Sequence, residues 1–378
     1  MKKIFLVLLI IAASLLCYKY SHFALWASRD KSNNSSKKII ISPTKKIENK
    51  FTQIKNKSIF VPYWNINEDL QTTNYDKYIY FGITANNQGI NKEEIGFSKL
   101  SFFVTATKDK NTYLTLRLLD NGFNQELLKD TDLQQKIIEQ TLEIVKENNF
   151  KGVVLDLEIF SLFNTEISSQ INDFVQTFYT SLKSNYKSFS IAIYGDTFYR
   201  KRPYDLAFIA KNCDEILVMA YDFSKAIGEP GPNFPLARQS DSDGGPEAQI
   251  YNYDFKLMTK DFLKYVSKEK ISIIFGMYGY DWKVDEKKRP ITTAKALTLK
   301  QIRKEFLNNC QWKDCVVKRD ALSRETEINY VYSTVKEDVG YMDYHIVWFE
   351  DEESVNVKTK YLQEQGIGSV GYWTYGYF

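Results

Sequence analysis

Eight short apolar segments recur between residue 58 and the end of the sequence, and they constrain the fold of this chain more than any other feature. Each has the length and composition of a β-strand. Amphipathic stretches separate them, most clearly over 133–148, where Ile138, Leu142 and Val145 recur at helical spacing. Strands that alternate with helices are typical of a parallel sheet, and eight such strands close a (β/α)8 TIM barrel of the α/β class. The predicted strands are 59–64, 77–83, 113–118, 152–158, 189–194, 215–221, 271–278 and 369–375.

One stretch interrupts this alternation. Residues 283–347 are too numerous for a loop that joins a barrel strand to its helix. We therefore predict a small inserted α+β subdomain on the barrel rim, between strand seven and the last helix. The folded domain as a whole is expected to span 58–378.

The first 57 residues differ in composition from the rest. Lys2 and Lys3 precede an apolar run over 4–17, which is the order found in a secretory signal. Because no A-x-A cleavage site follows, we favour a signal anchor over a cleaved signal peptide for residues 1–27, with the N-terminus inside. Residues 28–57 are rich in Lys, Asn and Ser, as a disordered polar tether is. The chain is therefore expected to be exported, either secreted or anchored to the membrane and facing outward.

Charge, histidine and cysteine content exclude several kinds of site. A net charge of +3 is too low to indicate a nucleic-acid partner. The only histidines, His22 and His345, lie far from every acidic motif, which argues against a metal site and a Ser-His-Asp triad. Acid–base chemistry is left to carboxylates or tyrosines, and no cofactor is expected. Cys310 and Cys315 are compatible with a short-loop disulfide in an exported chain or with two unpaired thiols.

Two carboxylates end the fourth predicted strand. Residues two apart in a strand project to the same face, so Asp156 and Glu158 are expected to point together into the barrel mouth. The C-terminal ends of the strands carry the active site in such barrels. Two carboxylates in one cleft repel each other, which favours a proton on one of them, as a general acid requires. For the D-x-E pattern alone, an acidic pair that faces solvent is the competing interpretation.

Five short motifs follow one another along the chain. They are KGVVLDLE at 151–158, VMAYDF at 218–223, GPNFPL at 231–236, FGMYGYDW at 275–282 and GYWT at 371–374. Together they resemble the signature segments of the family 18 glycoside hydrolases, the chitinase-like enzymes, on and after barrel strands four, six, seven and eight. Residues 347–351 and 366–368 most resemble the YaaH-type branch, which is associated with spore and cell-wall glycans. The resemblance covers nearly all of 58–378.

This resemblance implies roles for individual residues. Glu158 matches the general acid that protonates the glycosidic oxygen and then, as a base, activates water. Asp156 matches the carboxylate that orients the 2-acetamido group of the substrate, and Tyr221 matches the hydroxyl that donates to that group. The acetamido oxygen attacks the anomeric carbon, so the nucleophile belongs to the substrate. The expected substrate-binding residues are Asp222, Trp373, Met219, Tyr278, Trp282 and Tyr63. For Trp373 and Trp282, a core aromatic at a strand end is the competing interpretation.

The sequence departs from the family pattern at one chemically important position. Val154 stands where the family usually has a further Asp, and Lys151 stands where it usually has the first Asp of the signature. Val154 cannot share a proton with Asp156, so the departure affects the expected rate and pH optimum more than the expected fold.

Two functions are compatible with these features. The first is hydrolysis of β-1,4 linkages next to N-acetylglucosamine in peptidoglycan or a chitin-like polymer, by substrate-assisted retaining catalysis. The second is a non-hydrolytic, lectin-like envelope protein on the same barrel. The intact Glu158 favours the first and the missing carboxylate at Val154 favours the second. In either case the expected partners are an N-acetylated glycan and, through the N-terminal segment, a membrane, and the chain is expected to be a monomer.

Overall fold

The computed structural model of the chain describes residues 53–66, 70, 74–238, 250–336 and 339–378. The predicted signal segment, 1–27, and most of the predicted tether, 28–57, lie outside these residues. Within the part that the structure describes, no helix combines the length and the hydrophobicity needed to cross a membrane.

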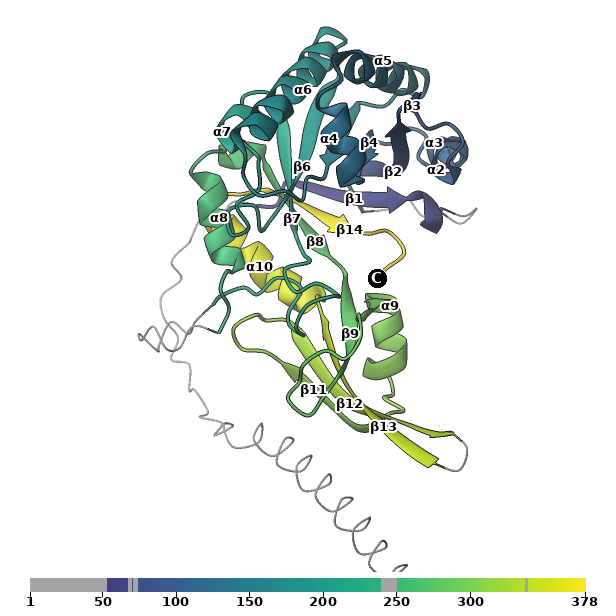
Figure 1. Cartoon of the computed structure of the whole chain (residues 1–378), viewed down its shortest axis with the longest axis vertical. Helices are drawn as coiled ribbons and strands as arrows, with labels where there is room; N and C mark the ends of the chain where they lie inside the picture. Colours follow the sequence, from purple (N-terminus) through teal and green to yellow (C-terminus); the bar gives the residue numbers. More distant parts are fainter. Residues whose placement is uncertain (1–52, 67–69, 71–73, 239–249, 337–338) are drawn as a thin grey trace, which may run out of the picture. The chain divides into compact units, whose positions relative to one another are not determined.

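A closed parallel barrel forms the centre of the described chain (Figure 1). Its strands follow one another around the barrel in the order β1, β14, β8, β7, β6, β5, β4 and β2, and β1 also pairs with β2, which closes the ring. The predicted (β/α)8 barrel is therefore confirmed. The strands are β1 (Asn56–Pro62), β2 (Lys77–Asn86), β4 (Thr112–Leu118), β5 (Gly152–Leu157), β6 (Ser188–Tyr194), β7 (Glu215–Ala220), β8 (Ile271–Gly276) and β14 (Ser369–Trp373). The short β3 (Gly89–Ile90) pairs antiparallel with the end of β2.

Alternation along each strand divides the hydrophobic residues between two layers. In β5, Val153 and Leu155 pack outward into the large core beneath the helices. Val154 points the other way, into a smaller cluster inside the barrel that includes Ile79 and Leu217. Because successive side chains of a strand face opposite sides, one strand supplies both layers and then places Asp156 on the inner side.

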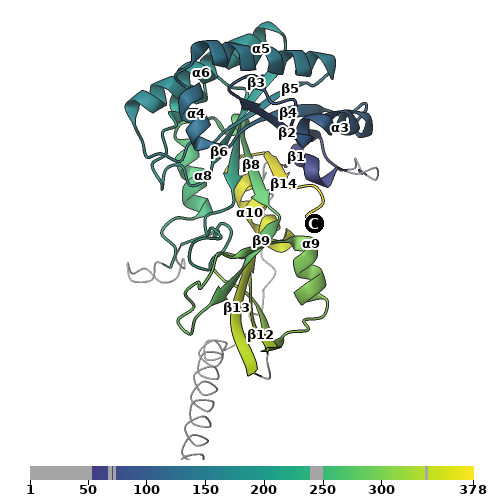
Figure 2. The same ribbon diagram turned by 45° about the vertical axis from the view of Figure 1, so that its right-hand side comes forward.

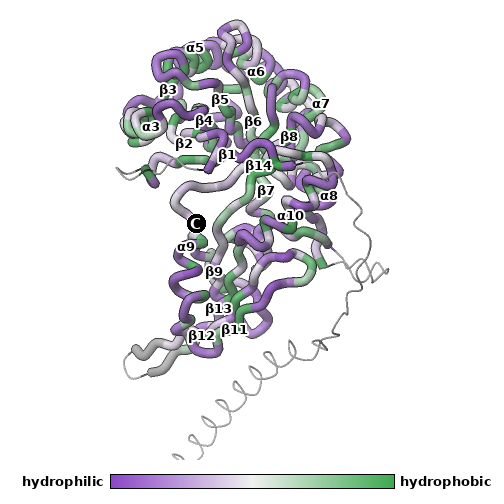
Figure 3. Tube along the Cα trace, turned by 180° about the vertical axis from the view of Figure 1, so that it is seen from behind, coloured by the Kyte–Doolittle hydropathy of each residue, from purple (hydrophilic) through white to green (hydrophobic). Residues whose placement is uncertain are grey.

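Helices cover the outside of the barrel, among them α5 (Thr131–Glu147), α6 (Thr165–Ser184), α8 (Phe255–Leu263) and α10 (Glu352–Glu364). Hydrophilic and hydrophobic residues alternate along α5 and α6 (Figure 3), as expected of helices with one buried face. Asp130 accepts a hydrogen bond from the Leu133 N–H at the start of α5. The shorter helical segments are η1 (Tyr63–Asn65), α2 (Ile95–Ser98), α3 (Leu100–Ala106), α4 (Asn121–Leu127), α7 (Leu206–Ile209) and η3 (Lys268–Lys270).

A second sheet interrupts the barrel between β8 and α10. It is antiparallel, in the order β10, β9, β13, β12, β11, and Figure 2 shows β8 running on into β9, with α9 nearby. It begins at Tyr278 and ends at Phe349, so it extends beyond both limits of the expected insertion, 283–347. Its elements are β9 (Tyr278–Val284), β10 (Lys295–Thr298), α9 (Leu299–Ile302), η4 (Arg303–Leu307), β11 (Lys313–Arg319), β12 (Thr326–Lys336) and β13 (Val339–Phe349).

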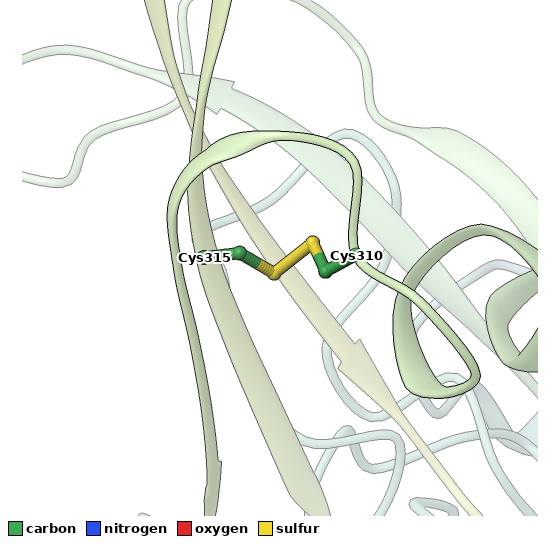
Figure 4. Close-up of a disulfide and its surroundings, with 2 residues drawn as sticks. All are labelled: Cys310 and Cys315. Carbon is green, nitrogen blue, oxygen red and sulfur yellow. A yellow bond between two sulfur atoms is a disulfide. The ribbon is translucent and has the colours of Figure 1, made fainter.

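A disulfide joins Cys310 to Cys315 within this insertion (Figure 4). Cys310 lies between η4 and β11, Cys315 lies in β11, and both side chains are partly buried. Of the two arrangements that the sequence left open for these cysteines, the structure has the disulfide. Cys213 is buried as a free thiol.

Buried charges tie the insertion to the barrel. The Lys358 ammonium on α10 donates to Glu325 Oε1 at 2.7 Å and to Glu350 Oε2, and none of the three side chains is exposed to solvent. Glu325 in turn accepts from the backbone N–H groups of Asn233 and Phe234, in the loop after β7. One buried lysine thus connects the last helix, the second sheet and a loop of the barrel rim.

This cluster predicts a specific pH dependence of stability. Burial raises the pKa of Glu350 from 4.5 to about 8, against the opposing effect of the Lys358 charge. Since the native state then holds a proton that the unfolded state releases more readily, the contribution of Glu350 to stability falls as pH rises from about 5 to about 8. In Glu350→Gln that contribution is absent. Chemical denaturation across this range should therefore show a smaller loss of unfolding free energy in the variant than in the wild type.

The matched control for this prediction is Glu364→Gln, the same substitution at an exposed position on the same helix. It should keep the wild-type slope of unfolding free energy against pH. Equal slopes in the wild type and Glu350→Gln would contradict the assignment of the proton to Glu350.

Candidate functional site

The C-terminal ends of the barrel strands surround a cavity of about 360 Å³. Because all eight strands are parallel, side chains that are far apart in sequence meet at this one rim. The lining residues are Phe60, Trp64, Phe81, Arg117, Leu119, Asp156, Glu158, Phe160, Ala192, Tyr194, Met219, Tyr221, Asp222, Lys225, Tyr278 and Trp373.

Asp156 and Glu158 enter the cavity from the end of β5, as their spacing predicts. The backbone at Glu158 is fixed on both sides: its N–H donates to the Leu118 carbonyl at 2.9 Å, and its carbonyl accepts from Asn124 Nδ2 at 2.9 Å. Asp156 is only 4% exposed, and its Oδ1 has no hydrogen-bond partner among the described residues. The pair is therefore held rigidly while one carboxylate oxygen remains available.

Burial dominates the electrostatics of this pair. It raises the pKa of Asp156 well above its ordinary value, with a further contribution from the Glu158 charge and an opposing one from Arg117. Burial also raises the pKa of Glu158, while the Tyr194 hydroxyl and the Lys225 ammonium oppose that shift. Both carboxyls thus hold their protons to higher pH than exposed carboxyls do, which is the condition for acid catalysis near neutrality.

Asp222, two residues after the end of β7, is held in an unusual backbone conformation. Its φ of 57° lies in the left-handed region, which costs a non-glycine residue free energy unless the surroundings stabilise it. Asn233 does so, because its Oδ1 accepts from the Asp222 N–H at 2.8 Å. The Asp222 carboxylate accepts from the hydroxyls of Tyr278 and Tyr280, the latter at 2.9 Å.

A chain of hydrogen bonds extends from Asp222 into the interior. Asn233 Nδ2 donates to the Gly276 carbonyl at 3.0 Å, and the Asn233 N–H donates to Glu325. Glu325 is the carboxylate paired with Lys358. The position of Asp222 at the cavity therefore depends on the buried charge cluster behind it.

Aromatic rings form the floor and one side of the cavity. The Trp373 ring lies 4.6 Å from Phe81 and 5.6 Å from Phe60, centroid to centroid, and 6.4 Å from the roughly parallel Tyr221 ring. Trp64 stands beside it at the rim and is 45% exposed. A sugar ring stacks on flat apolar surfaces of this kind.

Seven of the nine predicted site residues line this one cavity. They are Asp156, Glu158, Met219, Tyr221, Asp222, Tyr278 and Trp373. Tyr63 and Trp282 are not among its lining residues. Trp282 is completely buried between Val284 and Trp348 in the second sheet, and its Nε1 donates to the Gly228 carbonyl at 3.0 Å. It therefore occupies the core-aromatic position that the sequence left as the alternative.

Several cavity residues were missed from sequence, and Arg117 is the most informative. It is the only charged residue of β4. It lies two residues after Thr115, which is buried inside the barrel, so both side chains face the same side of the strand. A lone charge on the inner face at the C-terminal end of an apolar strand was a usable signal. Lys225, Tyr194 and Phe160 lie in or beside loops, where no periodicity indicates which side chains turn inward.

No group of three or more His, Cys, Asp or Glu side chains in the described part of the chain is arranged to hold a metal ion. The cavity therefore offers carboxyl, hydroxyl, guanidinium and ammonium groups over an aromatic floor. Such a set can move a proton at a bound polar molecule while that molecule stacks on Trp373.

The chain matches one protein family over most of its length and is similar to several curated bacterial proteins. The model of the family described as glycosyl hydrolases family 18 matches residues 24–377. Among curated proteins, the chain is 24% identical over 311 residues to the cortical fragment-lytic enzyme of Bacillus anthracis, covering 79% of this chain and 64% of that protein. It is 22% identical over 267 residues to the putative sporulation-specific glycosylase YdhD of Bacillus subtilis, covering 68% and 55%. The chain thus spans less than two thirds of the length of either relative.

Solved structures share the fold. A Group IV chitinase of Ostrinia furnacalis superposes with a TM-score of 0.69 at 15% identity, over 85% of this chain and 92% of that one. The spore cortex-lytic enzyme SleL of Bacillus cereus superposes with a TM-score of 0.61 at 20% identity, over 86% and 72%. At these identities the likeness shows the fold alone.

The position of Val154 leads to a prediction about stability. Val154 is completely buried in the apolar cluster inside the barrel, directly below Asp156. In Val154→Asp a carboxyl replaces an isopropyl group in this apolar cluster, where the paired residues Thr115 and Ser190 offer hydroxyls but no positive charge. The unfolding free energy should therefore fall by about 2 to 5 kcal/mol at neutral pH. The loss should be smaller at acidic pH, where the new carboxyl is buried as a neutral group. Thermal and chemical unfolding at both pH values measure this.

Val154→Thr is the control for this prediction, since it keeps the shape and adds a polar group without a charge. It should be destabilised less than Val154→Asp, and its loss should not depend on pH. A Val154→Asp variant with wild-type melting temperature would contradict the view that the site is packed around an apolar side chain.

Proposed function

Because this chain belongs to the family 18 glycosyl hydrolases, we propose that it hydrolyses β-1,4 linkages next to N-acetylglucosamine in peptidoglycan or a chitin-like glycan. The observation that carries the proposal is the convergence of Asp156, Glu158 and Tyr221 above Trp373 in one cavity. These residues come from three different strands of the barrel. A set with this chemistry matches what a substrate-assisted glycosidase needs.

The proposed reaction is substrate-assisted and retaining. Glu158 donates its proton to the glycosidic oxygen as the leaving sugar departs. The acetamido carbonyl oxygen of the substrate attacks the anomeric carbon at the same time, and the Tyr221 hydroxyl and Asp156 hold that group in place. Glu158, now a carboxylate, removes a proton from the water that opens the cyclic intermediate. The raised pKa that burial gives Glu158 supports the first step, because the acid must still carry its proton near neutral pH.

Val154 is the observation that favours a second function, glycan binding without hydrolysis. A neighbouring Asp could share a proton with Asp156, whereas Val154 is buried and apolar and offers no such partner. The retained Glu158, with its fixed backbone and raised pKa, favours hydrolysis. We therefore place binding alone second.

We also propose that the folded domain acts outside the cytoplasm, secreted or anchored at the outer face of a membrane, as a monomer. The disulfide between Cys310 and Cys315 supports this location, because such bonds persist in oxidising compartments and are rare in the cytosol. A glycan polymer of the envelope would be within reach there.

Removal of the proposed acid is the first test of the function. Glu158→Gln keeps the shape of the side chain but cannot donate a proton of suitable acidity, so kcat on N-acetylated oligosaccharides should fall by at least about 100-fold. Oligosaccharide binding, measured by calorimetry, should remain. Glu166→Gln, at an exposed position in the first turn of α6, is the matched control and should keep wild-type kcat.

Two outcomes of this test would contradict the proposal, one concerning the role of Glu158 and one concerning the function. Turnover that persists unchanged in Glu158→Gln would remove Glu158 from the mechanism. Binding with no turnover in the wild type, under conditions where a family 18 chitinase is active, would instead favour the glycan-binding function.

The acetamido group gives an independent test. Since the proposed nucleophile is its carbonyl oxygen, an oligosaccharide with free 2-amino groups should not be cleaved, whereas the N-acetylated form of the same length should be. A thiazoline that resembles the cyclic intermediate should inhibit competitively. Comparable cleavage of both oligosaccharides, followed by chromatography of the products, would exclude substrate assistance.

A further inference from the structure

Two basic side chains, Arg117 and Lys225, line the cavity without an acidic partner. No ion pair joins either of them to a carboxylate among the residues that the structure describes. Arg117 on β4 lies opposite Asp156 on β5 in the register of the two strands. Two cations in one small cavity are unusual, because charged groups away from water are normally paired.

The Arg117 guanidinium is surrounded by aromatic rings. Its central carbon lies 4.5 Å from the Phe81 ring centroid, 5.5 Å from that of Tyr63 and 5.9 Å from that of Trp64. Contacts with ring faces stabilise a cation, but they accept no conventional hydrogen bond from the N–H groups in the guanidinium plane. Nε and Nη1 are buried and have no hydrogen-bond partner among the described residues. The aromatic rings therefore hold the group in place and leave these donors unused.

The nearby carboxyls do not supply the missing counter-charge. Asp156 faces Arg117 in the strand register, but its Oδ1 and the Arg117 Nε and Nη1 have no hydrogen-bond partner among the described residues. Burial raises the pKa of Asp156, which disfavours the charged form of this carboxyl. Lys225 lies on the other side, where its charge partly offsets the effect of burial on the pKa values of Glu158 and Asp222. Lys225 thus balances the acid side of the site, and the charge of Arg117 remains uncompensated.

We propose that Arg117 binds a carboxylate of the glycan, so that the substrate class is an acidic N-acetylated glycan, such as one with the lactyl ether of muramic acid. The inference rests on the proposed function, since it assumes that the cavity receives the glycan. A planar guanidinium fits a carboxylate through two parallel hydrogen bonds, and a group held beforehand loses little entropy on binding. A neutral chitin-like polymer offers hydroxyl and amide groups only and leaves the charge unpaired.

The test compares oligosaccharides that differ in one group. The first, of alternating N-acetylglucosamine and N-acetylmuramic acid, has a free lactyl carboxylate, and the second has the same group as a primary amide. In the third, alanine is joined to the lactyl group through an amide bond, so that the free carboxylate is that of the alanine and lies farther from the sugar. Comparison of the first and third compounds shows whether Arg117 prefers a carboxylate on the sugar or one on the attached peptide. The expected kcat/KM of the wild type is at least about 10-fold higher for one of the two acids than for the amide, the scale of a charge-assisted hydrogen bond.

Variants assign the preference to Arg117. In Arg117→Met the ratio of kcat/KM for the preferred acid to that for the amide should fall to about 1, and Arg117→Lys should be intermediate because it keeps the charge without the planar fork. Lys260→Met, which removes an exposed charge on α8, controls for net charge and should keep the wild-type ratio. The ratio of kcat/KM for the preferred acid to that for the amide is measured on the wild type alone, so it still tests the inference if Arg117→Met does not fold.

The outcomes separate the inference from the function. Equal kcat/KM of the wild type for the amide and both acids overturns the inference and leaves hydrolysis standing. If neither these three compounds nor an N-acetylglucosamine oligosaccharide of the same length is cleaved, the proposed function fails, and calorimetry with the same three compounds still decides the inference. Tighter binding of an acid than of the amide, abolished in Arg117→Met, supports it, and equal binding overturns it.

Discussion

The pairing of β1 with both β2 and β14 closes the barrel, and the site depends on that closure. Phe60 on β1 contacts Phe81 on β2 and Trp373 on β14, with ring centroids 6.2 and 5.6 Å apart. If β1 were displaced, β2 and β14 would become free edges and Trp373 would lose its support. Closure also brings the carboxyl ends of all eight strands to one rim, where Asp156, from the middle of the chain, and Trp373, from near its end, line the same cavity.

Buried charges serve the fold and the site in opposite ways. Behind the rim, Lys358 is paired with Glu325 and Glu350, and these partners stabilise the junction of the second sheet with the barrel. In the cavity, Asp156 Oδ1 and two nitrogens of Arg117 have no partner among the described residues. The paired cluster positions the rim, and the unpaired groups are those that a bound molecule can satisfy. Preorganised binding requires this arrangement: a hydrogen-bonded charge cluster that holds the rim in place, and cavity groups whose hydrogen bonds are left for the bound molecule.

The fold was predictable from sequence because apolar strands alternate with amphipathic helices, and the positions of Asp156 and Glu158 followed from the two-residue period of a strand. Trp373, Tyr221 and Asp222 came from motifs, whereas Phe60, Phe81 and Trp64, which pack against Trp373, were not predicted. Arg117 was missed although its place, as the only charge in an apolar strand and on the inner face, indicated it. Asn233 and Glu325 were missed because their hydrogen-bond partners lie far away in sequence. The strand that begins at Tyr278 leaves the barrel for the second sheet, a change of direction that local composition does not indicate.

The anomeric configuration of the first product tests the central claim most directly. The proposed nucleophile is the acetamido group of the substrate, so two displacements occur at the anomeric carbon and the β configuration is retained. NMR spectra recorded immediately after the wild type cleaves a β-linked N-acetylated oligosaccharide, before mutarotation, report that configuration. An initial excess of the β-anomer is expected. An initial excess of the α-anomer would mean direct attack by water and would contradict the assignment of Asp156, Tyr221 and Glu158.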